Sequence, residues 1–251
     1  MVEVINGQYI LKLMVERKSV PASAVKLELE RRCKQIEAER GSKPQRKEKK
    51  AMKEDVIRDL MPRAFSKRSS HYVWIDPVNA MLVVDTSSEH AASLVVERVL
   101  TLMMALEAAP SVSMLKTKTS PQAAMSTWLT SMEAPFAFTV DRDLELKEPD
   151  NDQAVVRYVR HNLQIDEVVQ HIANGKLPIT LAMTFDSHVS FVLATNLALK
   201  RIELLDDVFT DNEDASAGFD GDVAMATGEL SKLIPALIAA LDGEADEPTQ
   251  E

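Results

Sequence analysis

The sequence predicts an α+β fold built from antiparallel sheets with flanking helices. Three observations predict this class. First, 45% of the 251 residues are apolar, which is enough to build a proper hydrophobic core. Second, short runs of strand-forming residues are joined by turn residues, as in hairpins and meanders. Third, several longer segments place apolar residues at helical spacing between helix-start and helix-stop residues.

The N-terminal part is predicted to contain one strand and two helices. Residues 8–16 are rich in strand formers and follow a turn at Asn6 and Gly7. In residues 21–40 the apolar side chains fall mainly on one side of a helix, with a proline at its first turn and a glycine just beyond its end. Residues 44–60 can form a second helix, which a proline then stops. Two helices joined by a basic bend are therefore expected.

The middle of the chain is predicted from turn and cap signals. Residues 72–75 and 81–84 are apolar, β-rich runs joined by a short turn, which indicates a hairpin. Thr86 and Glu89 have the spacing of a capping box for a helix through residue 108. The other elements predicted here are a strand at residues 112–116 and a helix at residues 120–131.

The C-terminal half is predicted to hold a sheet and a helix that docks on it. Three β-rich runs separated by two short turns indicate an antiparallel meander over residues 177–185, 189–194 and 198–205. The apolar helix at residues 229–241 is expected to pack on this sheet although Pro235 interrupts its hydrogen bonds. Further predicted elements are strands at residues 144–147 and 154–159, a helix at residues 164–173 and a frayed acidic tail at residues 244–251.

Charge is strongly segregated along the chain. The net charge of −10 argues on its face against nucleic acid, because a polyanion is normally bound by lysine and arginine. However, residues 1–70 carry 18 Lys and Arg against 10 Asp and Glu, whereas residues 203–251 carry 14 acids and the single base Lys232. A basic N-terminal region thus contrasts with an acidic C-terminal one.

Lysine and arginine crowd residues 43–53. Six of these eleven residues are basic and only Glu48 is negative. At 3.6 residues per turn the bases are expected to surround the helix rather than to form one stripe. The segment is interpreted as an arm that contacts phosphates, and the alternative is a solvated charged helix without a ligand. The six bases are Lys43, Arg46, Lys47, Lys49, Lys50 and Lys53.

Three smaller basic groups are further candidates for contact with DNA. Arg63, Lys67 and Arg68 flank Phe65 in a predicted loop, a combination that suits the backbone of nucleic acid, although Phe65 could equally be a core residue. Two basic islands in the acidic half imply an anionic partner, or else surface charge paired with neighbours such as Asp166 and Glu167. The first island is Arg157, Arg160 and His161, and the second is Lys200 and Arg201.

No residue pattern indicates a cofactor or a membrane segment. The single cysteine, Cys33, excludes a disulfide framework and cysteine-based metal sites, and it fits a reducing compartment. Residues 211–222 hint at a calcium loop, but Ala215, Ser216 and Asp222 stand where a ligand, a glycine and a glutamate are required. Uninterrupted apolar stretches fall far short of about 20 residues, and the first residues lack the pattern of a signal peptide. A cytoplasmic protein is expected.

Two rival functions stay open on the residues alone. The first is a metal-dependent nuclease that uses Asp76 and Asp85, although their positions at a turn and a strand end favour a structural role. The second is a protein-interaction scaffold that uses the acidic C-terminal face and never holds DNA.

The stretch LMPRAFSKRSSHYVWIDPVNAMLVVD, residues 60–85, resembles the RdgC family of bacterial DNA-binding proteins. The resemblance continues through the Asn6–Gly7–Gln8 turn and through Thr127–Trp128–Leu129 and Thr227–Gly228–Glu229–Leu230. It implies a non-enzymatic, nucleoid-associated protein in recombination, a ring-shaped homodimer that encloses single- or double-stranded DNA without sequence preference, and restraint of the RecA recombinase.

The resemblance also implies a domain layout and a role for Phe65. Residues 1–20 would be the remnant of an N-terminal sheet region, residues 21–135 a protruding helical and hairpin tip, and residues 136–251 an acidic α+β region. Phe65 would lie exposed at a dimer contact. Family members carry a further N-terminal segment before the turn at Asn6, so the strand at residues 8–16 is expected to have an unpaired edge.

Overall fold

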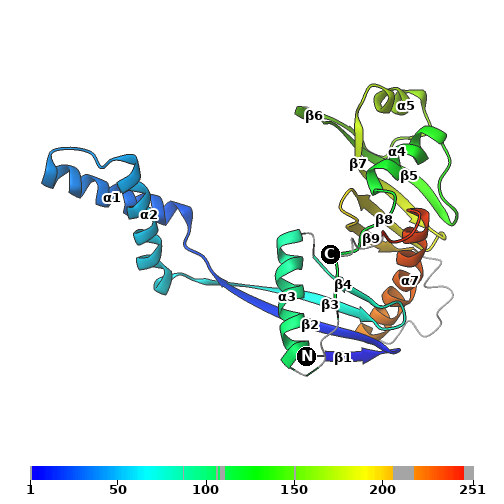
Figure 1. Cartoon of the computed structure of the whole chain (residues 1–251), viewed down its shortest axis with the longest axis horizontal. Coiled ribbons are helices and arrows are strands. Elements are labelled where there is room, and N and C mark those ends of the chain that lie inside the picture. The colour runs from blue at the N-terminus through cyan, green and yellow to red at the C-terminus, as the bar shows by residue number, and fades with distance from the viewer. Residues whose placement is uncertain are drawn as a thin grey trace, which may run out of the picture. The chain divides into compact units, whose positions relative to one another are not determined.

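The computed structural model describes residues 2–86, 88–105, 107, 111–149, 151–205 and 218–245. The chain forms two compact units: unit 1 is Leu11–Val73, and unit 2 is Val2–Ile10 together with Trp74–Glu251. Helices and two separate sheets make up the described residues, so the predicted α+β class is confirmed (Figure 1).

The first sheet has four strands in the order β1-β2-β3-β4. These strands are β1 (Val2–Ile5), β2 (Gln8–Lys18), β3 (Ser66–Asp76) and β4 (Met81–Val84). Asn6 and Gly7 both have positive φ, which is the turn that suits a two-residue hairpin and folds β1 back onto β2. The expected unpaired edge at residues 8–16 is therefore wrong for the start of β2, which lies between β1 and β3, whereas β2 continues to Lys18 and outruns the four-residue β1.

Unit 1 carries two helices. α1 (Ala22–Arg40) follows Pro21 and ends at Gly41, whose positive φ of 71° is the left-handed cap that glycine favours. α2 (Arg46–Leu60) begins with a capping box between Gln45 and Glu48, and it continues into the 3₁₀ turn η1 (Met61–Arg63). The predicted helix pair and its bend are confirmed.

The second sheet belongs to unit 2 and has the order β6-β5-β7-β8-β9. Its strands are antiparallel, and β7, β8 and β9 form the predicted meander. The bounds are β5 (Phe138–Glu148), β6 (Asn151–Tyr158), β7 (Leu177–Phe185), β8 (Val189–Ala194) and β9 (Leu199–Leu204).

Three helices complete the core of this sheet: α4 (Pro121–Ser131), α5 (Asp166–Ala173) and α7 (Gly218–Ala240). Met125, Val168 and Leu233 of these helices are fully buried in one cluster with sheet residues such as Leu181 and Phe191. By length and composition α7 could cross a membrane, and two of its side chains, Leu233 and Leu237, are buried in this core.

Two predicted local features differ from the structure. α3 (Glu89–Ala105) is capped by Ser88, whose hydroxyl accepts a hydrogen bond from the Ala91 N–H, rather than by Thr86. Residues 112–116 form no strand. Instead, Lys116, Lys118 and Thr119 make backbone hydrogen bonds with residues 241–245, and Thr117 and Glu244 form an isolated bridge there. The bulk of the suspected calcium loop, residues 211–217, lies outside the described residues.

Candidate nucleic-acid interface

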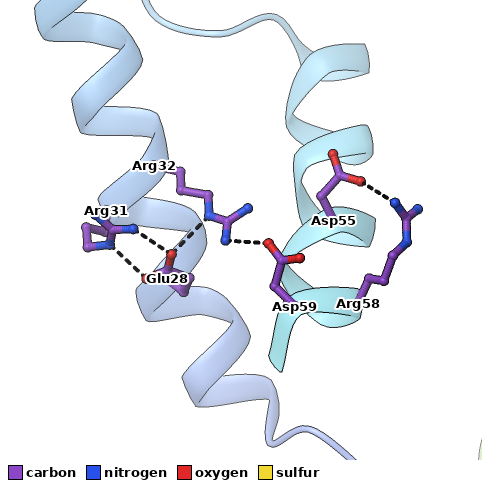
Figure 2. Close-up of polar contacts among 6 residues, drawn as sticks. All are labelled: Glu28, Arg31, Arg32, Asp55, Arg58 and Asp59. Atoms are coloured by element: carbon purple, nitrogen blue, oxygen red, sulfur yellow. Dashed lines mark hydrogen bonds and ion pairs between the residues drawn. The ribbon is translucent and has the colours of Figure 1, made fainter. Parts of the chain in front are cut away.

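Acidic partners neutralise the basic residues in one part of the helix pair of unit 1. Glu28 accepts hydrogen bonds from Arg31 and Arg32, and Arg32 also reaches Asp59 at 2.8 Å, which ties α1 to α2 (Figure 2). Hydrogen bonds from the two arginines lower the pKa of Glu28 to about 2, so this carboxylate stays charged. Farther along α2, Arg58 pairs with Asp55 at 3.2 Å. These arginines are therefore engaged within the unit.

The first two turns of α2, in contrast, carry basic side chains that no acid in the described part of the chain pairs with. Because the helix begins at Arg46, four bases occupy positions i, i+3, i+4 and i+7 and share one face. The expectation that the bases surround the helix is wrong for these four, and only Lys47 lies off the face. The four residues, which we call the α2 basic face, are Arg46, Lys49, Lys50 and Lys53.

All four residues of the α2 basic face are exposed, and within the described residues none has a hydrogen bond or an ion pair from its side chain. The one acid among them, Glu48, is already occupied by the Gln45 N–H and by Arg40 at 3.3 Å. Lys43, just before the helix, is 4.0 Å from Glu37. The α2 basic face is thus an uncompensated positive surface, the kind that attracts phosphates.

The predicted loop around Phe65 is only partly a loop. Arg63 ends η1, Phe65 is 92% exposed, and Lys67 and Arg68 already belong to β3, because β3 follows β2 to its end. Arg68 pairs with Glu16 on β2 at 3.0 Å. Phe65 is therefore no core residue, while Arg68 is the member of this group that an acid neutralises.

The two basic islands of unit 2 meet at one carboxylate. Asp143 on β5 accepts a hydrogen bond from the Arg160 backbone N–H at 2.8 Å, and its second oxygen lies 3.2 Å from the Arg201 guanidinium. Arg160 has a φ of 54°, so the chain turns sharply there. The sequence showed no sign of this meeting, because the second island follows the first by some 40 residues and Asp143 precedes both.

Ion pairs within unit 2 limit how many cations of these two islands are free to bind an anion. Arg157 lies directly opposite Glu145 across β5 and β6 and is 3.0 Å from its carboxylate. The predicted pairing of surface charge is present for Arg157 and Arg201, but with Glu145 and Asp143 rather than with the expected neighbours. The Nδ1 of His161 lies 2.8 Å from a backbone carbonyl. Within the described residues only the side chains of Arg160 and Lys200 have no hydrogen bond or ion pair here.

The two carboxylates of the nuclease alternative do not form a metal site in the described chain. Asp76 is fully buried, and its oxygens accept hydrogen bonds from Val78, Asn79 and Gln8. Burial alone would raise the pKa of Asp76, but these hydrogen bonds outweigh it and hold the pKa below its ordinary value. Asp85 is exposed, and the described residues hold no group of three possible metal ligands.

Comparison with known proteins gives one consistent family. Residues 1–244 match the family described as "Putative exonuclease, RdgC". The chain is 42% identical over 250 residues to a "Recombination-associated protein RdgC" from Dechloromonas aromatica (strain RCB), which covers 97% of this chain and 81% of that protein. Proteins with the same name from Janthinobacterium sp. (strain Marseille) and Herminiimonas arsenicoxydans are 41% and 42% identical, with coverage of 96% and 97% of this chain and 81% of each relative.

Proposed function

This chain belongs to the RdgC family of recombination-associated proteins, and from this premise we propose that it binds single- and double-stranded DNA without sequence preference. The binding is electrostatic, and the protein acts as a ring-shaped homodimer around the DNA in the nucleoid. By occupying DNA it restrains the RecA recombinase.

The α2 basic face is the observation that carries the proposal. Four exposed cations without acidic partners in the described residues stand on one side of a helix, in a unit whose other arginines are largely paired. From Arg46 to Lys53 the face spans about 10 Å of helix axis. A duplex carries one phosphate of each strand for about every 3.4 Å of its axis, so a face that lies along this axis can meet about three of them.

Phe65 supports the proposed dimer. Phe65 lies next to a strand and is 92% exposed, so no part of the described chain covers its ring. Exposed aromatic side chains of this kind often anchor contacts between proteins. A second copy that places its own Phe65 against this one would bury both rings and close the ring around DNA.

We further propose that the protein is not a nuclease, although one description of its family names an exonuclease. The support is Asp76: its buried carboxylate is occupied by hydrogen-bond donors of the chain and has no free oxygen for Mg²⁺. Incubation with the protein and Mg²⁺ should leave both a supercoiled plasmid and the same plasmid made linear intact, and either nicking of the circle or shortening of the linear form from its ends would overturn this part of the proposal.

The main test is the salt dependence of DNA binding. We expect the logarithm of affinity to fall linearly with the logarithm of salt concentration, equally for random and genomic duplexes. In Lys50→Gln/Lys53→Gln the slope should become shallower by about 1.8, at about 0.9 per lost phosphate contact. The matched control, Arg31→Gln/Arg58→Gln, removes the same charge from paired positions and should keep the wild-type slope. Salt-insensitive or absent binding would favour a protein-interaction scaffold.

A further inference from the structure

Three contacts define how β2 and β3 are paired. Gln8 reaches Asp76, Lys12 lies over the ring of Tyr72 at 5.1 Å, and Glu16 pairs with Arg68. For every step forward on β2, the partner moves one step back on β3, so the strands are antiparallel and in one continuous register. The same register places Arg17 directly opposite Lys67.

This ladder has two different faces, because side chains alternate along a strand. On one face the charges are satisfied: Glu16 neutralises Arg68, and Lys12 lies on an aromatic ring. On the other face Arg17 and Lys67 stand side by side. Both are exposed, and neither side chain has a hydrogen bond or an ion pair within the described residues.

Like charges directly opposite each other destabilise a strand pair, since their Cβ atoms are only about 5 Å apart. An anion between the two side chains would remove this repulsion and would gain charge-assisted hydrogen bonds, for which arginine offers a two-pronged donor. Ser69, two residues beyond Lys67 and therefore on the same face, is also exposed and adds a hydroxyl donor.

We propose that Arg17 and Lys67, assisted by Ser69, form a phosphate-binding pair on one face of the β2–β3 ladder, and that its ligand is a phosphodiester of the nucleic-acid backbone. This site rests on the proposed DNA binding and extends it from helix α2 to a strand pair in the same unit. Arg17 lies outside the basic segments that stand out in the sequence, and its role depends on which residue lies opposite.

The test uses a single substitution that removes the positive charge of Arg17 and also neutralises Lys67. Arg17→Gln removes one phosphate ligand, so the slope of log affinity against log salt should become shallower by about 0.9. Arg17→Glu should instead form an ion pair with Lys67 and remove two ligands, for a change of about 1.8. Between 50 and 200 mM salt, these changes correspond to about 3.5-fold and about 12-fold smaller losses of affinity than in the wild type.

The controls separate the site from general charge loss. Lys12→Gln removes one charge from the other face and should keep the wild-type slope, while Arg17→Lys should retain most of the binding. The double variant Arg17→Gln/Lys67→Gln, which removes both cations without adding an acid, should show the same slope as Arg17→Glu. Fluorescence anisotropy of a labelled duplex with the full chain gives every slope, and competition with inorganic phosphate checks that the ligand is part of a nucleic acid.

The possible outcomes are distinct. If Arg17→Gln and Arg17→Glu both keep the wild-type slope while Lys50→Gln/Lys53→Gln lowers it, the phosphate pair is refuted and DNA binding by α2 stands. Equal effects of Arg17→Gln and Lys12→Gln would also refute the pair, since only general charge would then matter. Displacement of the duplex by millimolar inorganic phosphate at constant ionic strength would refute the nucleic-acid ligand. If the wild type does not bind DNA at all, the proposed function fails, and this site fails with it.

Discussion

Substitution of Asp76 should destabilise the protein more than any change at the basic surface. Its buried carboxylate accepts hydrogen bonds from the backbone N–H groups of Val78 and Asn79 at 2.9 and 3.2 Å, and from the side chains of Asn79 and Gln8 at 2.7 and 3.4 Å. In Asp76→Ala the side chains can reorient, but the two backbone donors cannot. At about 1–3 kcal/mol for each unsatisfied donor, less what water recovers, the free energy of unfolding should fall by about 2–3 kcal/mol.

This loss is large enough to measure in two ways. For a chain of this size it corresponds to a decrease of about 4–12 °C in Tm. Urea unfolding followed by tryptophan fluorescence reports on the same network, because Trp74 donates a hydrogen bond to Gln8 at 2.7 Å. Asp76→Asn keeps one acceptor oxygen, but its new NH₂ group faces the NH₂ group of Asn79, and both are donors. The free energy of unfolding should therefore fall about half as much as in Asp76→Ala.

The pH dependence gives a second and independent check. Because the folded-state pKa of Asp76 lies below its ordinary value of 3.8, the carboxylate stabilises the fold fully above that pH. Its contribution is lost as the pH falls through the lowered folded-state pKa. The difference between wild type and Asp76→Asn should therefore be complete at pH 7 and shrink below about pH 3.8. A Tm change under 1 °C in Asp76→Ala, or a difference that is unchanged at pH 3, would refute the structural role.

Two further predictions concern the dimer and the packing of α7. Phe65→Ala should loosen the dimer by more than tenfold, because an apolar anchor at a contact is worth about 2 kcal/mol or more; sedimentation with and without circular DNA measures this, and unchanged retention on closed circles would contradict the role of Phe65. Glu229→Gln should lower Tm at pH 7, because burial would raise the pKa of Glu229 but hydrogen bonds from Lys232 at 2.7 Å and His188 at 3.1 Å outweigh it and lower the pKa. That stabilisation is complete above pH 4.5 and is lost as the pH falls through the lowered folded-state pKa, so thermal melts should show a smaller difference between variant and wild type at pH 3 than at pH 7.

Local turn chemistry explains where the sequence predicted the fold well. The predicted bounds of β7 and β8 agree with the structure, because the residues between them adopt left-handed conformations at Asp186 and Ser187 that only a few residue types accept readily. The helix pair of unit 1 was predictable for the same reason, from a proline before α1 and a glycine after it. In such places the signal lies within four or five residues of the feature.

The failures arose where a distant partner decides the local structure. Residues 112–116 have strand composition but no neighbouring strand in the described chain, so they stay irregular. β5 and β3 extend well beyond their apolar centres because β7 and β2 supply hydrogen bonds to the polar ends. β1 was not predicted at all, since four residues carry too weak a pattern, yet its pairing with β2 covers the start of the edge that was expected to be open.

Charge shows the same limit, and its distribution is compatible with the proposal that an acidic protein binds a polyanion. Of two arginines that look alike in the sequence, Arg157 is neutralised by Glu145 across a strand pair, whereas Arg17 faces another cation. At physiological salt a charge acts over about 8 Å, so a phosphate at the α2 basic face responds to the cations there and to the acids close by. The acid within this run of bases, Glu48, is already occupied. The net charge of the chain sums over charges that are too far apart to act on one bound phosphate. Whether a given side chain can bind a ligand depends instead on whether an acid nearby already neutralises it.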